Sequence, residues 1–275
     1  MDNFDLKKYL AEGKLLKEAQ GNPKAIILAG APGAGKGSIL GDLDLSGLKV
    51  FNLDDTILAL SKVEKFSLNQ KDTDFENRSA FMKAMAVATK KLKGEQIPTA
   101  IANKDSFILD GTAASAKQTQ LLSDQLKEAG YSVMMLYVYT HLETSLKRNE
   151  RRFEKSGGED RSLMPGAVYR TWIDVAKNFE TYQNMFGNNF ISVANTGKDE
   201  TMNDVEAILK KYIRPFDVKD GKPKTDKEIA RSKDSAAALN AEVQDFLNSD
   251  KVQNIIDSSV SKEEAQSKIT SFING

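Results

Sequence analysis

The run Gly30-Ala31-Pro32-Gly33-Ala34-Gly35-Lys36-Gly37-Ser38 is the feature that most constrains the fold of this chain. It follows an apolar run, Ala25-Ile26-Ile27-Leu28-Ala29, and precedes a helix-like segment that begins at Ile39. A strand, a glycine-rich turn, a lysine and a helix, in this order, wrap the phosphates of a nucleotide. Glycines let backbone N–H groups turn inward, and the following helix adds about half a positive charge at its N-terminus. We therefore expect a nucleoside triphosphate along residues 30–38, with Lys36 on the β and γ phosphates.

The loop departs from the strict pattern at one position. Serine or threonine usually follows the lysine and contacts Mg²⁺, but here that position is Gly37 and the hydroxyl comes at Ser38. Mg²⁺ would then be held mainly through water and a carboxylate, which suits its reluctance to dehydrate. We expect Ser38 to contact the α-phosphate and to lie near the metal. The alternative is a glycine-rich turn that binds no ligand.

Composition narrows the class of protein. The 275 residues are enough for one sizeable core, with a small appendage. The 39 basic and 39 acidic residues balance, so any attraction to nucleic acid would come from a local patch. The chain has no cysteine, which excludes disulfides and thiolate chemistry, and it shows no apolar run near the ~20 residues of a membrane span. These features predict a cytoplasmic protein with no membrane contact.

Short apolar runs alternate with longer helical patterns from residue 24 to about 213, as in a parallel sheet flanked by helices. The expected fold is therefore a P-loop NTPase fold of the α/β class with a parallel five-stranded sheet and a small helical C-terminal appendage. The expected strands are 25–29, 50–53, 106–109, 133–139 and 190–193. The expected helices are 35–44, 55–63, 74–93, 115–129, 142–155, 166–186 and 199–213.

The two ends of the chain differ from this middle part. Residues 1–22 form an amphipathic pattern, typical of a helix that packs on the core; Leu10-Ala11-Glu12 also resembles the cleavage motif in capsid-targeting leaders of large tailed phages. That resemblance implies a phage-encoded, virion-associated protein. Residues 217–235 are predicted to be a solvated linker, and 236–274 a set of short helices that dock on the main domain or contact a protein partner. The predicted division is 1–22, 23–213 and 214–275.

Acidic residues follow the second and third expected strands. Asp54 and Asp55 come directly after the second, and Asp110 and Thr112 after the third. Ligands of open α/β sheets bind beyond the carboxyl ends of the strands, so these groups should face the γ-phosphate. We assign Asp54 as general base, Asp55 and Thr112 to substrate binding, and Asp110 with Ser38 to Mg²⁺. The alternatives are a helix N-cap for the first pair and a simple turn at Asp110-Gly111.

Arginines gather on the helix expected at 142–155 and just after it. Arg148 and Arg152 are four residues apart and share a helix face, and Arg161 follows the Gly157-Gly158 break. Arginine forks match phosphate oxygens, so we expect Arg148, Arg152 and Arg161 to belong to a lid that stabilises transition-state charge. The alternative is a solvated charged face. The lone histidine, His141, is expected at the surface.

With these residues identified, the chain resembles the zeta-toxin and polynucleotide-kinase-like branch of P-loop kinases, over about residues 24–213. In that family the acidic residue after the second strand is the base, which implies Asp54, and the lid arginines imply Arg148, Arg152 and Arg161. The resemblance rests on the loop at 30–38, Asn52-Leu53-Asp54-Asp55, Ile108-Leu109-Asp110-Gly111-Thr112, the run 126–133 followed by Arg148, and Arg161-Ser162-Leu163-Met164-Pro165.

Three departures limit what the resemblance implies. Members usually have a hydroxyl residue at the position of Gly37, and polynucleotide kinases have a basic residue near the position of Ile57. The glycine loop resembles that of adenylate kinase more closely, but Thr112 and Ala113 replace the Phe-Pro of its Asp-Gly-Phe-Pro-Arg motif. A nucleic-acid substrate and a nucleoside monophosphate are therefore both less favoured.

The expected activity is transfer of the γ-phosphate of ATP, with Mg²⁺, to a hydroxyl of a small molecule or nucleotide-sugar. The alternatives are a 5′-hydroxyl polynucleotide kinase, a nucleotide kinase, and a non-catalytic nucleotide-binding phage protein. The residues around 56–105 should build the acceptor pocket, but they contain no motif that identifies the acceptor.

Overall fold

A computed structural model describes residues 21–41, 43–70, 75–157, 160–196, 218–219, 222–223 and 225–275. The amphipathic segment predicted at 1–22 lies outside these residues up to residue 20, and so do its leader motif and the helix predicted at 199–213. Within them, no helix is both long and apolar enough to cross a membrane.

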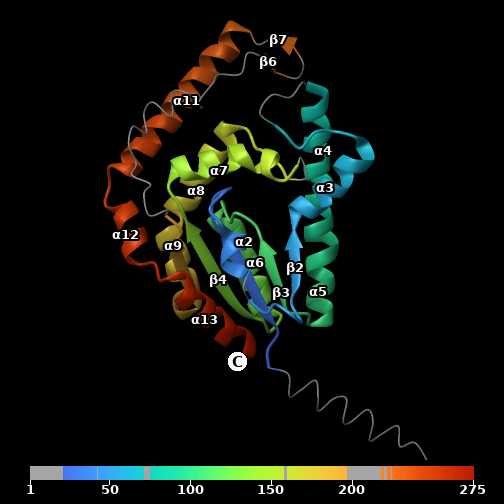
Figure 1. The fold of residues 1–275 in the computed structure, drawn as a ribbon, viewed down its shortest axis with the longest axis vertical. Coiled ribbons are helices and arrows are strands. Elements are labelled where there is room, and N and C mark those ends of the chain that lie inside the picture. The colour runs from blue at the N-terminus through green and yellow to red at the C-terminus, as the bar shows by residue number, and fades with distance from the viewer. Residues whose placement is uncertain are drawn as a thin grey trace, which may run out of the picture.

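The centre of the molecule is a parallel sheet with the order β2-β3-β1-β4-β5 (Figure 1). All five strands were predicted from the sequence, with bounds that agree to within two residues. They are β1 Lys24–Ala29, β2 Lys49–Asn52, β3 Phe107–Asp110, β4 Ser132–Tyr139 and β5 Phe190–Ala194. The strand that carries the glycine loop, β1, is therefore central, with β3 and β4 on either side.

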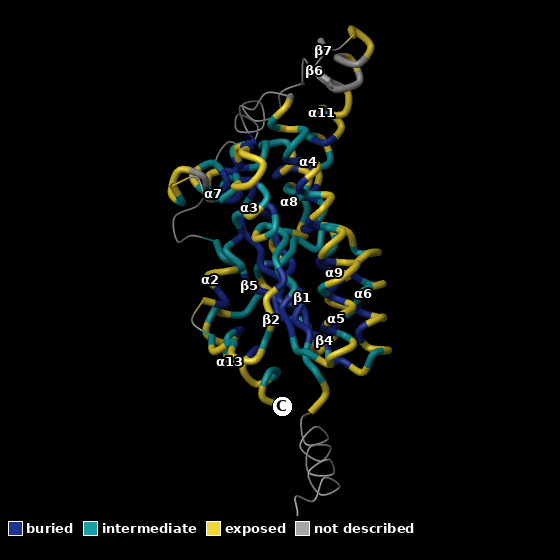
Figure 2. Tube along the Cα trace, turned by 90° about the vertical axis from the view of Figure 1, so that its right-hand side faces the viewer, coloured by how far each residue is buried: buried dark blue, intermediate teal, exposed yellow. Residues whose placement is uncertain are grey.

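Side chains alternate between the two faces of the sheet, and each face builds its own core. On one face Ile27 and Tyr137 pack under α5 (Ile97–Asn103), α6 (Ala116–Glu128), α8 (Pro165–Lys177) and α9 (Phe179–Phe186). On the other, Ile26 and Leu136 pack under α2 (Lys36–Leu40) and α13 (Lys262–Asn274). Figure 2 shows the buried strands between these two layers.

Several helices differ from their predicted bounds. The helix after the glycine loop ends at Leu40 rather than at 44. The helix expected at 166–186 is two helices, α8 and α9, which meet at Asn178; the Asn178 side chain donates its Nδ2–H to Ala114 O at 3.0 Å. After α3 (Leu53–Glu64), α4 (Phe75–Lys91) continues through a π-helical turn, η1 (Leu92–Gln96), into α5, which was not predicted.

The C-terminal part of the chain belongs to the core. The helix α11 runs over Asp226–Leu247 and so begins inside the segment predicted to be a linker, because no glycine or proline follows Pro223 there. Its Val243 and Phe246 are buried against the α8 side of the sheet. After α12 (Lys251–Asp257), α13 buries Ile269 on the opposite face, and Gln266 Nε2 donates to Ile39 O at 2.8 Å.

A small hairpin, β6 (Val218–Lys219) and β7 (Lys222–Pro223), precedes α11.

Four aromatic residues of α8 and α9 belong to the core. Trp172, Phe179, Tyr182 and Phe186 are all buried. His141 is half-buried beside Tyr139 rather than at the surface, because it lies directly before α7 (Leu142–Lys155) at the packed end of β4.

Candidate active site

The glycine loop adopts a backbone that only glycine tolerates at key positions. Gly33 and Gly35 have φ of 81° and 90°, a region that side chains rarely adopt. A Cβ atom on Gly35 would lie 2.1 Å from Asn195 Nδ2, and one on Gly33 would lie 2.9 Å from Ser145 O. The sequence pattern at these positions is therefore explained by the close packing of α7 and the residue after β5 against the loop.

Three successive carbonyl groups of the loop accept hydrogen bonds from side chains of α7 and of the residue after β5. Ser145 Oγ donates to Pro32 O, Arg148 Nη1 donates to Gly33 O at 3.1 Å, and Asn195 Nδ2 donates to Ala34 O at 2.8 Å. In a trans peptide the N–H points away from the carbonyl, so the N–H groups of Gly33 and Gly35 face the opposite side. The loop is thus held as a concave set of donors suited to an anion.

Two of these anchoring residues were not predicted. Ser145 and Asn195 carry no recognisable motif, and only the fold brings them to the loop. Arg148, predicted as a lid arginine, lies behind the loop and does not line the pocket described below.

Lys36 lies at the start of α2 with its ammonium turned into the loop. Its Nζ donates to Gly30 O at 3.0 Å and lies 3.4 Å from Ala31 O. Burial lowers the pKa of Lys36, while the carboxylates of Asp110 and Asp54 act in the opposite direction. Ser38 is exposed, and its Oγ donates to Gly35 O at 2.7 Å.

The carboxyl ends of β2 and β3 bring the predicted residues Asp54 and Asp110 together around Asn52. Asn52 is the N-cap of α3, because its Oδ1 accepts the N–H of Asp54 at 2.8 Å, so neither Asp54 nor Asp55 is the cap. Asn52 Nδ2 donates to Asp110 Oδ2 at 3.1 Å, which matches the pairing of these two residues in the sheet register. Sequence reasoning missed this role of Asn52, although an asparagine before two acidic residues is a cap signal.

Burial raises the pKa of Asp110, and the nearby Lys36 ammonium opposes that change. Thr112 lies next to the loop, where its carbonyl accepts the N–H of Gly30 at 3.1 Å. Among the described residues there is no group of three or more side chains that could hold a metal alone. One carboxylate beside a phosphate site nevertheless fits Mg²⁺, which keeps several waters and uses one or two carboxylates plus phosphate oxygens.

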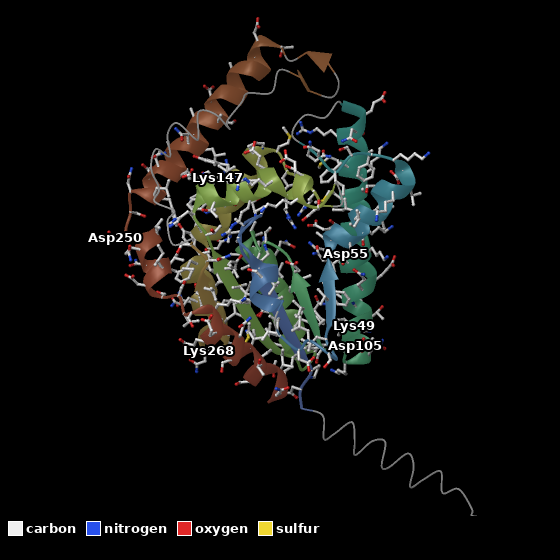
Figure 3. The ribbon with its side chains drawn as sticks, viewed as in Figure 1. Lys49, Asp55, Asp105, Lys147, Asp250 and Lys268 are labelled. Carbon is white, nitrogen blue, oxygen red and sulfur yellow. The ribbon has the colours of Figure 1, made fainter. Side chains whose placement is uncertain are left out.

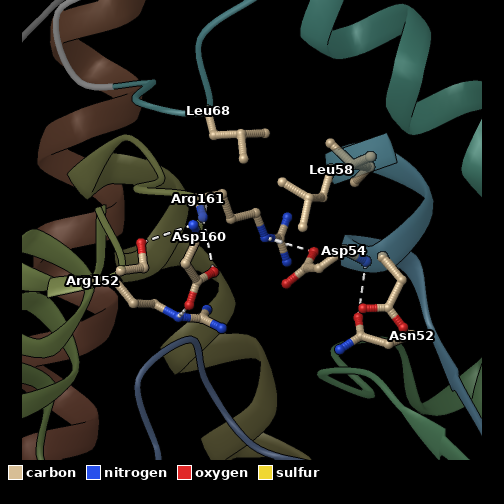
Figure 4. Close-up of a pocket in the computed structure, with 10 residues that line it drawn as sticks. Asn52, Asp54, Leu58, Leu68, Arg152, Asp160 and Arg161 are labelled. Carbon is tan, nitrogen blue, oxygen red and sulfur yellow. Dashed lines mark hydrogen bonds and ion pairs between the residues drawn. The ribbon is translucent and has the colours of Figure 1, made fainter. Parts of the chain in front are cut away.

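Two arginines form ion pairs in front of the loop. Arg161 Nε lies 2.8 Å from Asp54 Oδ1, and Arg152 Nε lies 2.6 Å from Asp160 Oδ2 (Figure 4). Both arginines and Asp54 influence the pKa values of Lys36 and Asp110, so the five charged groups converge on one place. Asp55 lies at the start of α3 (Figure 3); it is exposed and lines the pocket described next.

These groups open onto a pocket of about 300 Å³ between α3 and the end of α7 (Figure 4). Its apolar wall comes from α3 and the following segment, inside the 56–105 range expected to form the acceptor pocket. A separate apolar cluster around Phe66 and Phe81 supports that wall from the α4 side. The pocket is lined by Asn52, Asp54, Asp55, Ile57, Leu58, Leu68, Arg152, Ser156, Asp160 and Arg161.

Solved structures with similar folds have low sequence identity to this chain. The AvrRxo1-ORF1:-ORF2 complex with ATP is 16% identical, with a TM-score of 0.51, over 85% of this chain and 79% of that one. A chain of the PezAT chromosomal toxin–antitoxin system of Streptococcus pneumoniae is 16% identical, with a TM-score of 0.45, over 88% of this chain and 98% of that one. No curated protein sequence matches significantly.

The model of the family described as zeta toxin matches residues 7–203, which is well over half of the sequence. The chain therefore belongs to the zeta toxin family and has the fold of its P-loop kinases.

Proposed function

We propose that this protein is an ATP-dependent kinase that transfers the γ-phosphate to a hydroxyl of a small molecule or nucleotide-sugar. The observation that carries the proposal is the convergence of Lys36, Asp54, Asp110, Arg152 and Arg161 at the boundary between the glycine loop and the pocket. Phosphoryl transfer needs these elements: a phosphate cradle, a carboxylate that takes a proton, and cations that stabilise the transferring group.

The proposed step uses Asp54 as general base. The acceptor hydroxyl binds in the pocket, gives its proton to a carboxylate oxygen of Asp54 and forms a bond to the γ-phosphorus. The bond from the γ-phosphorus to the bridging oxygen breaks at the same time, and ADP leaves with that oxygen. Lys36 and the loop N–H groups hold the β and γ phosphates, while Arg152 and Arg161 face the charge on the transferring group. Mg²⁺, when bound near Asp110 and Ser38, would neutralise phosphate charge.

The choice of ATP has support from the family and from the fold. The similar solved complex of AvrRxo1-ORF1 and -ORF2 contains ATP, and the fold is shared over most of both chains. A protein partner is also proposed, because that structure is a complex of two chains. The C-terminal helices bury Val243 and Ile269 in this chain's own core, so a partner would bind their outer faces.

The charge of the pocket favours a small acceptor over a nucleic acid. Three carboxylates and two guanidinium groups line it, and Asp160 and Asp54 each pair with one of the arginines. A nucleic-acid backbone would therefore meet a pocket whose lining carries one more carboxylate than it has guanidinium groups.

The proposal is tested by following labelled γ-phosphate from ATP into a panel of metabolites, nucleotide-sugars and 5′-hydroxyl oligonucleotides. We expect labelled small molecules with the natural protein and none with Lys36→Ala. Label in the oligonucleotides alone would instead establish a polynucleotide kinase, and no transfer to any member of the panel would count against kinase activity.

A further inference from the structure

Asn149 is buried on α7 and binds the segment that carries Arg161. Its side chain is 2% exposed, and it contacts Leu163 twice: Nδ2 donates to Leu163 O at 2.8 Å, and Oδ1 accepts the Leu163 N–H at 3.0 Å. The carboxamide thus pairs with both backbone groups of one residue, as a neighbouring strand would. This contact fixes the backbone two residues after Arg161.

The same segment is bonded on its other side to residues that follow α3. Ser162 N donates to Leu68 O at 3.1 Å, and Gln70 N donates to Ser162 O at 2.8 Å. The Ser162 hydroxyl is also buried and donates to Asn149 O at 3.0 Å. Arg161, predicted to belong to a lid, is therefore followed by a segment that is attached both to α7 and to the wall of the pocket.

Arg161 leaves this fixed backbone and reaches Asp54 across the pocket. The Arg161 Nε to Asp54 Oδ1 distance is 2.8 Å, although neither atom completes a directed hydrogen bond. Both atoms are buried, and Arg161 reaches Asp54 from a backbone that Asn149 and Leu68 hold in place. A flexible side chain also loses less freedom when its backbone is already fixed.

We propose that Asn149 is a positioning residue that sets Arg161 against Asp54. The inference rests on the proposed function for the role of Arg161, but the geometric part is independent of it. Displacement of a charged group by about 1 Å can cost two orders of magnitude in rate. Loss of the two Leu163 bonds should therefore slow transfer without weakening the phosphate loop.

The first test follows the Arg161 Nε–Hε resonance by NMR in the full-length protein, assigned by its absence in Arg161→Lys. Asn149→Ala should shift and broaden this resonance, and Asn149→Asp should do so less, because its carboxylate still accepts the Leu163 N–H. The control is Asn178→Ala, which also removes an asparagine that donates to a backbone carbonyl, at Ala114, outside the pocket. An unchanged resonance in Asn149→Ala would overturn the inference, whether or not the protein turns over ATP.

The second test uses γ-phosphate transfer to the acceptor found in the panel described above. Asn149→Ala should lower kcat at least tenfold and leave the KM for ATP within about twofold of the natural protein. The double variant Asn149→Ala/Arg161→Ala should have the same kcat as Arg161→Ala alone. A merely structural role would instead lower the melting temperature and add to the effect of Arg161→Ala. That additive result would contradict positioning, while a wild-type protein with no transfer would defeat the proposed function and leave the NMR result to decide this inference.

Discussion

Arg161 Nε lies 2.8 Å from Asp54 Oδ1, at the boundary between the glycine loop and the pocket. The contact is an ion pair between two buried atoms, neither of which completes a directed hydrogen bond. This relationship joins the proposed base to a cation that can face the transferring phosphate.

Removal of the Arg161 charge should slow phosphate transfer and leave nucleotide binding intact. Loss of one donor to a developing anion costs about 10²–10³ in rate, so Arg161→Ala should lower kcat by that amount. Arg151→Ala is the matched control, because Arg151 is an exposed arginine of α7 that does not line the pocket. Equal losses in the two variants, measured as initial rates of transfer, would indicate a general effect of positive charge.

A side chain at position 35 should disrupt the phosphate loop. The Cβ of Gly35→Ala would lie 2.1 Å from Asn195 Nδ2 at a φ of 90°, so the loop must shift and ATP binding should fall at least tenfold. Gly37→Ala is the control, because a Cβ there meets no atom within 4 Å. Calorimetric titration with ATP measures both, and equally tight binding in Gly35→Ala would show that the loop does not need this geometry.

Replacing the Asp110 carboxylate with a neutral amide should stabilise the ligand-free protein and abolish phosphate transfer. Burial raises the pKa of Asp110, so the folded protein binds more protons than the unfolded chain between the ordinary carboxyl pKa and the raised value. Stability contributed by this group is therefore lost as pH rises through that window. At pH 7, Asp110→Asn should therefore raise Tm. The gain should shrink as pH falls toward 4; a lower Tm at pH 7 would contradict this interpretation.

The helix α13 should contribute to global stability. Ile269 is fully buried against the sheet face on which α2 also packs. Ile269→Ala should therefore lower the free energy of unfolding by about 2–4 kcal/mol. Val63→Ala, at a residue 77% exposed, should change the free energy of unfolding by less than about 0.5 kcal/mol. Urea denaturation followed by circular dichroism compares them, and a small effect at Ile269 would mean that α13 is dispensable.

The sheet was predictable because each of its strands is marked by a short pattern of neighbouring residues. The five apolar runs, the glycine loop and the acidic residues at strand ends are each readable within a few residues, and the parallel fold then places Asp54 and Asp110 at the same edge. The helix α5 and the start of α11 were missed because neither has a strong apolar face in sequence. At the break between α8 and α9, Asn178 contacts Ala114, a residue 64 positions away that only the fold brings close.

The less predictable part of the site consists of polar side chains that hydrogen-bond to the backbone of residues far away in the sequence. Asn195 bonds Ala34, and Ser145 bonds Pro32, across more than 100 residues each. No local pattern marks such residues, because any asparagine or serine at the right place would do. The sequence also placed Arg148 with the lid arginines, since it shares a helix face with Arg152, yet it bonds Gly33 O behind the loop.

The role of Asp54 as the base is tested by comparing Asp54→Asn with Asp55→Asn in the labelled γ-phosphate assay. Both carboxylates line the pocket, but only Asp54 pairs with Arg161 and influences Lys36 and Asp110. We predict that Asp54→Asn binds ATP normally and loses transfer by about 10²–10⁴-fold, while Asp55→Asn keeps most of its rate. Normal transfer by Asp54→Asn, or its loss in Asp55→Asn alone, would contradict the assignment of Asp54 as the base.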